Sequence, residues 1–112
     1  MKLVVGIIKP FRLEDVKTTL NQIGIRGITI TEIKGYGRQK GHPVSYRGSE
    51  YSTDFVAKLM VRTAVPDSLV QPVVEGILRA ARTGEIGDGK IFVHPLEAVT
   101  RIRTGERGES AV

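Results

Sequence analysis

Residues 82–90 combine three glycines with an arginine and a lysine at the two ends of the segment. Glycine lets a backbone approach a ligand closely and turn its N–H groups towards it, and fixed positive charge balances an anion. A polyphosphate ligand needs both properties. The segment even satisfies the G-x-x-x-x-G-K spacing of a P-loop, from Gly84 to Lys90. It is therefore the first candidate for a binding site.

The surroundings of this segment do not fit a P-loop. A P-loop follows a strand, opens a helix and continues with Ser or Thr, which contacts a magnesium ion. Here Ile91 follows the lysine, an apolar helical pattern precedes the glycines, and residues 91–93 have the composition of a strand. We therefore expect nucleotide binding without NTPase chemistry. The plain alternative is a helix C-cap with a tight turn, but a turn needs no cations such as Lys90, Arg101 and Arg103.

The bulk composition restricts the other kinds of site. The chain has no cysteine, which excludes disulfides and thiolate metal sites, and its two histidines, His42 and His94, are far apart. A length of 112 residues with 40% hydrophobic content predicts one domain with an aliphatic core. The net charge of +5 favours anionic partners. The longest apolar run, residues 3–8, is too short to span a bilayer, so we expect a cytoplasmic protein.

Hydrophobic periodicity predicts the elements that must position the candidate site. Apolar steps of three and four predict helices at 13–23 and 69–80, with Asp67 as the cap of the second helix and Pro72 delaying or kinking its start. Strands are predicted by alternating or β-branched runs at residues 2–9, 28–33, 55–65, 91–93 and 98–102, the last being a short C-terminal strand. The order β-α-β-β-α-β indicates an α+β, ferredoxin-like sandwich.

Three loops complete this expected domain, which covers residues 1–112. A long, glycine-rich and basic loop of about 37–54 joins the second and third strands, and loops of that length are usually functional. The candidate phosphate loop covers about 82–90, and a C-terminal loop covers about 102–112. Strands 2–9 and 55–65 are apolar on both faces. Because two helices cover only one face of such a sheet, we expect an oligomer to bury the other face.

Five colinear motifs resemble one family, the P-II nitrogen regulatory signalling proteins. They are IKPF at 8–11, KGYGRQKG at 34–41, YRGSEY at 46–51, RTGEIGDGKIF at 82–92 and RIRTGE at 101–106. The resemblance spans nearly the whole chain in order, without gaps. It implies a homotrimer of ferredoxin-like protomers, with nucleotide sites in the clefts between subunits. It also implies that ATP and ADP compete there, and that 2-oxoglutarate joins ATP through a magnesium ion.

The resemblance assigns roles to individual residues. Gln39 and Lys58 match the 2-oxoglutarate and Mg²⁺ contacts, together with Gly87, and Gln39 is the one protein group that reaches the metal. Tyr51 matches a tyrosine that is uridylylated or adenylylated in some relatives, and Ser49 a serine phosphorylated in others. The residues that match nucleotide contacts are Thr29, Gly35, Tyr36, Gly37, Arg38, Gly87, Asp88, Gly89, Lys90, Arg101 and Arg103.

The function implied by the resemblance is non-enzymatic signalling. The chain would sense ATP, ADP and 2-oxoglutarate, and would regulate an ammonium channel or a metabolic or modifying enzyme through its long loop. Contact with a membrane would be indirect, through a transporter. Residues 42–45 and Arg62 depart from the common family pattern. A divergent member that senses adenylates or another small anion, in transport or carbon metabolism, is therefore the alternative.

Two other classes of protein fit the sequence less well. An RNA-recognition domain shares the element order, and residues 34–37 imitate the start of its signature. That signature should continue with aromatic residues on the third strand, whereas Arg38, Gln39 and Lys40 follow here, so we expect no nucleic-acid partner. An enzyme is not indicated either, because no nucleophile–base pair or convergent pair of carboxylates is visible. Asp88 and Glu85 could at most orient a water molecule for slow ATP hydrolysis.

Overall fold

The computed structural model of the chain describes residues 1–36, 43–46, 49–52 and 55–112. Its main sheet is antiparallel and has the strand order β2-β5-β1-β6. The elements of the main body are β1 (Lys2–Ile8), α1 (Leu13–Ile23), β2 (Thr29–Tyr36), β5 (Phe55–Val65), α2 (Val70–Ala81) and β6 (Ile91–Pro95). This arrangement confirms the predicted α+β, ferredoxin-like fold.

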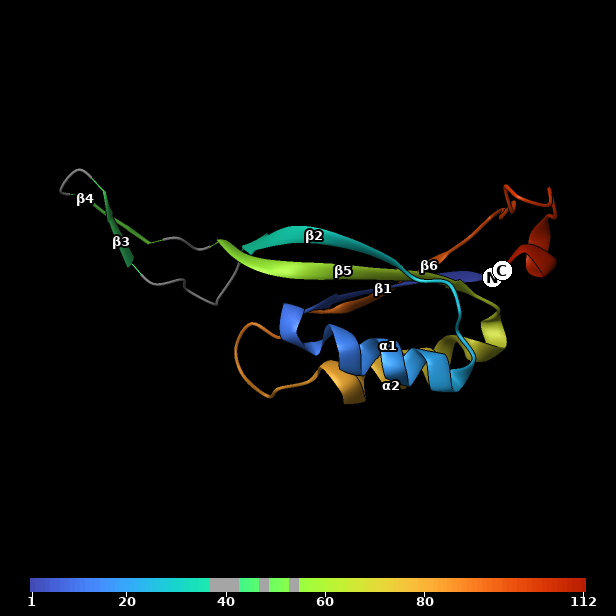
Figure 1. Cartoon of the computed structure of the whole chain (residues 1–112), viewed down its shortest axis with the longest axis horizontal. Coiled ribbons are helices and arrows are strands. Elements are labelled where there is room, and N and C mark those ends of the chain that lie inside the picture. Colours follow the sequence, from blue (N-terminus) through green and yellow to red (C-terminus); the bar gives the residue numbers. More distant parts are fainter. Residues whose placement is uncertain (37–42, 47–48, 53–54) are drawn as a thin grey trace.

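Both helices lie on the same side of the main sheet (Figure 1). The core between the layers is aliphatic, because alternate strand residues such as Val4, Ile8 and Val61 meet Leu20 of α1 and Ile77 of α2, all at most 2% exposed. The other side chains of β1 and of its neighbours therefore point to the side without helices.

The face of the sheet without helices is apolar in its centre. It carries Leu3, Val5 and Ile7 of β1, with Met60 of β5 opposite Ile7 and Phe92 of β6 opposite Val5. Phe92 is 45% exposed, whereas Val5 is already buried by its neighbours. The prediction that the central strands are apolar on both faces is therefore confirmed in the described part of the chain.

The long loop between the second and third predicted strands contains regular structure that its sequence did not indicate. Two short strands, β3 (Pro43–Tyr46) and β4 (Ser49–Ser52), form an antiparallel pair that lies beyond the ends of β2 and β5, away from the helices (Figure 1). Each has only four residues, too few for a hydrophobic period. β2 also extends three residues further than predicted, because Tyr36 pairs with Phe55.

Two further predictions about the ends of elements were wrong. Asp67 does not cap α2 through its side chain; its carboxylate accepts hydrogen bonds from the N-terminal amine at 2.7 Å and from Lys2 at 2.9 Å. Residues 98–102 do not form a strand, since the chain there makes a single bridge between Thr100 and Arg107 and then turns.

The predicted late start of the second helix is confirmed. A 3₁₀ turn, Asp67–Leu69, precedes the α-helical residues, so Pro72 lies in the first turn of α2, where its missing N–H has no intrahelical partner to lose. The first helix ends as predicted, with Gly24 in the left-handed conformation (φ 101°). Further 3₁₀ turns occur at Pro10–Arg12 and Gly108–Ala111. Among the described residues, no helix has the length and apolar character needed to cross a membrane.

Candidate functional site

The 82–90 loop connects the end of α2 to the start of β6, and the orange trace in Figure 1 shows it at the end of the sheet where β5 begins. Its last residue is held on the central strand, because Ile7 donates its backbone N–H to the carbonyl of Lys90 at 2.9 Å. Gly84 and Gly87 have φ angles of 82° and 106°, which favour glycine. The loop is thus a defined turn whose far end is part of the fold.

Gly89 is required for a different reason. A β-carbon built at this position would lie 2.0 Å from the carbonyl oxygen of Ile7, closer than any non-bonded contact. The sequence predicted that the glycines let the backbone approach a ligand closely. At Gly89, the close approach is between the loop and β1. Only Gly84 and Gly87 serve the shape of the turn itself.

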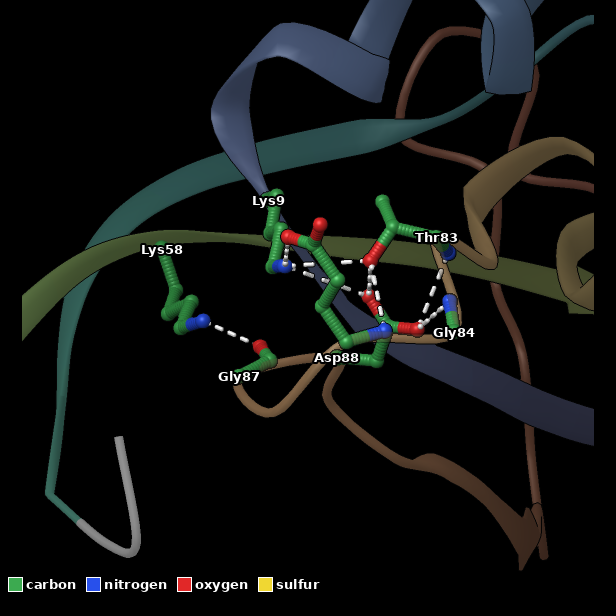
Figure 2. A network of polar contacts seen from close by, with 7 residues as sticks. Lys9, Lys58, Thr83, Gly84, Gly87 and Asp88 are labelled. Carbon is green, nitrogen blue, oxygen red and sulfur yellow. Dashed lines mark hydrogen bonds and ion pairs between the residues drawn. The ribbon is translucent and has the colours of Figure 1, made fainter.

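The carboxylate of Asp88 closes the loop on itself (Figure 2). One oxygen, Oδ1, accepts the hydroxyl hydrogen of Thr83 at 2.6 Å. The other, Oδ2, accepts the backbone N–H groups of Thr83 and Gly84, both at 2.9 Å. The Thr83 hydroxyl is the largest cause that lowers the pKa of Asp88 to about 2, and the two N–H groups and the charge of Lys9 act in the same direction, against burial.

Lys9 supplies a buried positive charge beneath this turn. It follows β1 and is 8% exposed, and its amino group donates to the Thr83 hydroxyl at 3.1 Å. The same amino group lies 3.6 Å from Asp88 and 3.9 Å from the exposed Glu85 (Figure 2). A lysine is seldom buried unless a carboxylate is near. Lys9, Thr83 and Asp88 thus form one network that joins β1 to both ends of the turn.

Lys58 contacts the loop from the other side. It lies on β5, is 7% exposed, and donates a hydrogen bond to the backbone carbonyl of Gly87 (Figure 2). Burial is the main cause that lowers the pKa of Lys58 below its ordinary value, and the nearby charge of Lys9 adds to the effect, while Asp88 opposes it. The structure therefore brings together two residues that the family resemblance assigned to the 2-oxoglutarate and Mg²⁺ contacts, Lys58 and Gly87.

The three cations predicted to meet phosphate do not converge within one chain. Lys90 is exposed at the end of the 82–90 loop. Arg101 and Arg103 belong to the C-terminal segment, which lies at the opposite end of the sheet from that loop (Figure 1). Arg101 is paired with Glu106 at 3.2 Å, and Arg103 is exposed in a turn. Within one chain, the 82–90 loop and the C-terminal segment therefore do not form one site.

The remaining candidate residues lie on or beyond β2. Thr29 begins β2 opposite Arg62, and Gly35 and Tyr36 end it opposite Val56 and Phe55. Three predicted contacts, Gly37, Arg38 and Gln39, lie outside the described residues. The two modification candidates belong to β4, where Ser49 pairs with Tyr46 and Tyr51 pairs with Val44.

Arg62 lies on the same face of β5 as Lys58, because strand residues four positions apart point to the same side. Its guanidinium contacts the Thr31 hydroxyl of β2 at 3.4 Å. Its Nε is buried and has no hydrogen-bond partner among the described residues. The departure from the family pattern thus puts positive charge next to Thr29, one of the residues that match a nucleotide contact.

Sequence reasoning missed the roles of Lys9 and Thr83. Lys9 belongs to a quoted motif and Thr83 to the candidate loop, yet neither was given a function. The sequence did place a lysine directly after an apolar strand, and a lysine that is buried at such a position needs a carboxylate nearby. In the described part of the chain, no group of three His, Cys, Asp or Glu side chains could hold a metal ion.

Comparison with known proteins identifies the family. The family model described as nitrogen regulatory protein P-II matches residues 1–106. The chain is 56% identical to the nitrogen regulatory protein P-II of Azospirillum brasilense over 112 residues, which is the full length of both chains. It is 55% identical to the nitrogen regulatory protein GlnK of Escherichia coli and 54% identical to the P-II protein of Rhodospirillum rubrum, again over both full lengths. The chain therefore belongs to the P-II family of nitrogen regulatory signalling proteins.

Proposed function

We propose that this protein is a non-enzymatic homotrimeric sensor that binds ATP and ADP in the clefts between its subunits. The observation that carries the proposal is that the 82–90 loop, which contains Lys90, and the C-terminal segment, which contains Arg101 and Arg103, lie at opposite ends of the sheet (Figure 1). In a closed ring, the 82–90 loop of one subunit can meet the C-terminal segment of the next. The exposed apolar centre of the sheet supports such an assembly, since a subunit interface would cover Phe92.

The charges of these segments suit a nucleotide polyphosphate. Lys90 makes no ion pair with a described residue, so its charge is available to an anion. The pair between Arg101 and Glu106 has both side chains about 40% exposed (39% and 42%), and exposed pairs are weak. Arg101 can therefore exchange Glu106 for a phosphate, with which an arginine forms stronger bidentate bonds.

We further propose that 2-oxoglutarate binds next to the 82–90 loop when ATP and Mg²⁺ are present. Lys58 supports this proposal, because it is a buried ammonium at the position that matches the oxoacid contact and it already contacts Gly87. A carboxylate of the ligand would replace the Gly87 carbonyl as its acceptor. Gln39 would complete the site by contacting the metal.

A regulatory role without catalysis fits the acids of the loop. The carboxylate of Asp88 accepts three hydrogen bonds, and its pKa of about 2 makes it a poor base. The signal would leave through residues 37–54, which contain β3 and β4, to a nitrogen-related transporter or enzyme in the cytoplasm. Tyr51 or Ser49 would be the place of covalent modification. An RNA-binding role lacks support, since the described residues of β1 and β5 on the face of the sheet without helices include no aromatic side chain.

Calorimetry with Mg-ATP and with ADP tests the central proposal. Lys90→Ala and Arg103→Ala should each lose a charge-assisted phosphate contact of about 1.5–3 kcal/mol, which corresponds to about tenfold to a hundredfold in affinity. The matched control is Lys17→Ala, which removes an exposed lysine that pairs with Glu14 on α1. Unchanged affinity in both test variants would mean that the phosphates bind elsewhere.

Mixed trimers test whether the site is shared between subunits. If Lys90 and Arg103 come from neighbouring subunits, co-refolding Lys90→Ala with Arg103→Ala protomers restores one intact site in each mixed trimer. If both side chains come from one chain, no mixture restores binding. The number of sites that titrate with full affinity separates the two arrangements.

A further inference from the structure

Both carboxylate oxygens of Asp88 accept hydrogen bonds from other residues of the 82–90 loop. Its two oxygens accept three hydrogen bonds from Thr83 and Gly84, at 2.6 to 2.9 Å, and Lys9 lies 3.6 Å away. All three donors belong to the first residues of the loop, whereas Asp88 lies next to Gly89 and Lys90 at its end. The carboxylate therefore ties the start of the turn to its end, much as an Asx turn does over a shorter span.

We propose that Asp88 is a positioning residue, whose carboxylate shapes the loop for phosphate while making no contact with the ligand. The proposal rests on the nucleotide-binding function proposed above and refines it, because the family resemblance assigned Asp88 to the nucleotide contacts without saying what its side chain does. A carboxylate that faced a phosphate would repel it. Turned inwards onto N–H groups, the same carboxylate holds the backbone of Gly87 to Lys90 in one conformation before the ligand arrives.

Thr83 and Lys9 complete this positioning device. Thr83 donates its hydroxyl to Asp88 and accepts hydrogen bonds from Lys9 at 3.1 Å and from the Glu85 N–H at 3.2 Å. Lys9 is 8% exposed and follows β1, so it links the turn to the most buried strand of the sheet. The Ile7 N–H bond to the Lys90 carbonyl fixes the other side of the loop on the same strand. The loop is thus preorganised from both ends by one element.

The positioning role and a simple charge effect predict opposite changes in nucleotide affinity for Asp88→Asn. Asp88→Asn removes a negative charge near the site, so a pure charge effect would tighten the binding of ATP and ADP. The amide of Asn can offer only one acceptor oxygen, so it cannot hold the Thr83 hydroxyl and the two N–H groups together. If Asp88 positions the loop, Asp88→Asn therefore weakens binding, by at least about tenfold.

A second pair of variants leaves the charge unchanged. Thr83→Val removes the hydroxyl that joins Lys9 to Asp88, so the affinity for ATP and for ADP should also fall by several fold. Thr83→Ser keeps the hydroxyl and should keep wild-type affinity. Asp67→Asn is the matched control for charge, because Asp67 also carries a pKa of about 2 but pairs with the N-terminus and Lys2, away from the loop. Nucleotide affinity should not change in that variant.

The experiment combines calorimetry of ATP and ADP with amide hydrogen exchange of the ligand-free trimer. Faster exchange of the Thr83 and Gly84 amides in Asp88→Asn and Thr83→Val, with weaker binding in both and rescue in Thr83→Ser, supports the proposal. Equal or tighter binding in Asp88→Asn, or equal loss in Thr83→Val and Thr83→Ser, overturns it. If the wild-type protein binds neither nucleotide, the proposed function fails instead, and protection of the two amides still decides whether Asp88 anchors the turn.

Discussion

The α-carbon of Gly89 lies against the backbone of Ile7, so that a β-carbon at this position would fall 2.0 Å from the Ile7 carbonyl oxygen. The neighbouring Lys90 carbonyl accepts the Ile7 N–H at 2.9 Å. The loop and the central strand are therefore in direct backbone contact, and neither can move without the other. This contact makes the stability of the fold and the conformation of the candidate site depend on one residue.

Gly89→Ala should destabilise the protein by roughly 1–3 kcal/mol, because the new methyl group meets backbone atoms that have no rotamer to change. Nucleotide affinity should fall as well, since the loop must shift away from β1. Urea denaturation at a fixed protomer concentration measures the stability. Gly27→Ala is the matched control, because its β-carbon would meet nothing within 4 Å, and its effect should stay within about 0.5 kcal/mol. Equal stability of the two variants would contradict this reading of the contact.

Asp88 should contribute to stability with a defined dependence on pH. Its pKa is lowered from 3.8 to about 2 in the folded chain, so its contribution is fully present above about pH 4 and is lost as the pH falls towards 2. Between these values the unfolded chain binds more protons. Asp88→Asn should therefore flatten the dependence of the unfolding free energy on pH in this window. A slope identical to that of the wild type would show that Asp88 is not held as described.

Asp67 provides a comparison with a different cause. Its pKa is also lowered to about 2, by hydrogen bonds from Lys2 and the N-terminal amine, but the group is exposed. Salt screens exposed charges, and the Debye length approaches about 3 Å near 1 M salt. In about 0.5–1 M salt, Asp67→Asn should therefore change the pH dependence of the unfolding free energy less than it does at low salt. The part removed by Asp88→Asn should persist, because it depends mainly on short hydrogen bonds. Acid titrations at two salt concentrations distinguish the two carboxylates.

Lys58→Ala should abolish the binding of 2-oxoglutarate in the presence of Mg-ATP and leave ADP affinity largely unchanged. The reason is that Lys58 would supply the carboxylate contact, whereas ADP depends on Lys90 and the arginines. Because burial lowers the pKa of Lys58, oxoacid binding should also weaken at alkaline pH before the ordinary value of 10.5 is reached. Lys17→Ala, which removes an exposed lysine of α1, is the control, and Arg62→Ala tests whether the departure at that position blocks the oxoacid. Binding of oxoglutarate to neither the wild type nor Arg62→Ala, with nucleotides still bound, would identify a divergent member of the family.

Size exclusion with light scattering should give about three times the protomer mass of 12.3 kDa. Phe92→Glu should shift the protein towards smaller species, because it puts a charge on the open face of the sheet. Phe11→Glu serves as the control, since Phe11 is 70% exposed in the 3₁₀ turn after β1, where the Arg12 guanidinium lies over its ring at 5.5 Å. A wild-type monomer at micromolar concentration would exclude the proposed assembly, and with it a site shared between subunits.

Sequence alone was enough for the elements whose signal is local. The helix at 13–23 and the late start caused by Pro72 depend on residues within one or two turns of each other, so spacing and capping preferences reveal them. The strands of the central sheet could be predicted for the same reason, because apolar residues at every second position indicate a strand with one buried face. The short strands β3 and β4 were missed, since four residues each carry too little periodicity. The 82–90 loop was found because its residue types are themselves unusual.

The partners of the charged residues were decided only by tertiary structure. Asp67 was predicted to cap the helix beside it, but its donors are Met1 and Lys2, more than sixty positions away (66 and 65). Lys9 meets Asp88 only because β1 passes beneath the loop that precedes β6. A hydrogen bond or ion pair depends on distance in space, which the order of residues does not encode until the sheet has formed. For the same reason, the sequence could name Lys90 and Arg103 together, whereas the fold puts the 82–90 loop and the C-terminal segment at opposite ends of the sheet (Figure 1). The proposed trimer would bring the two segments together.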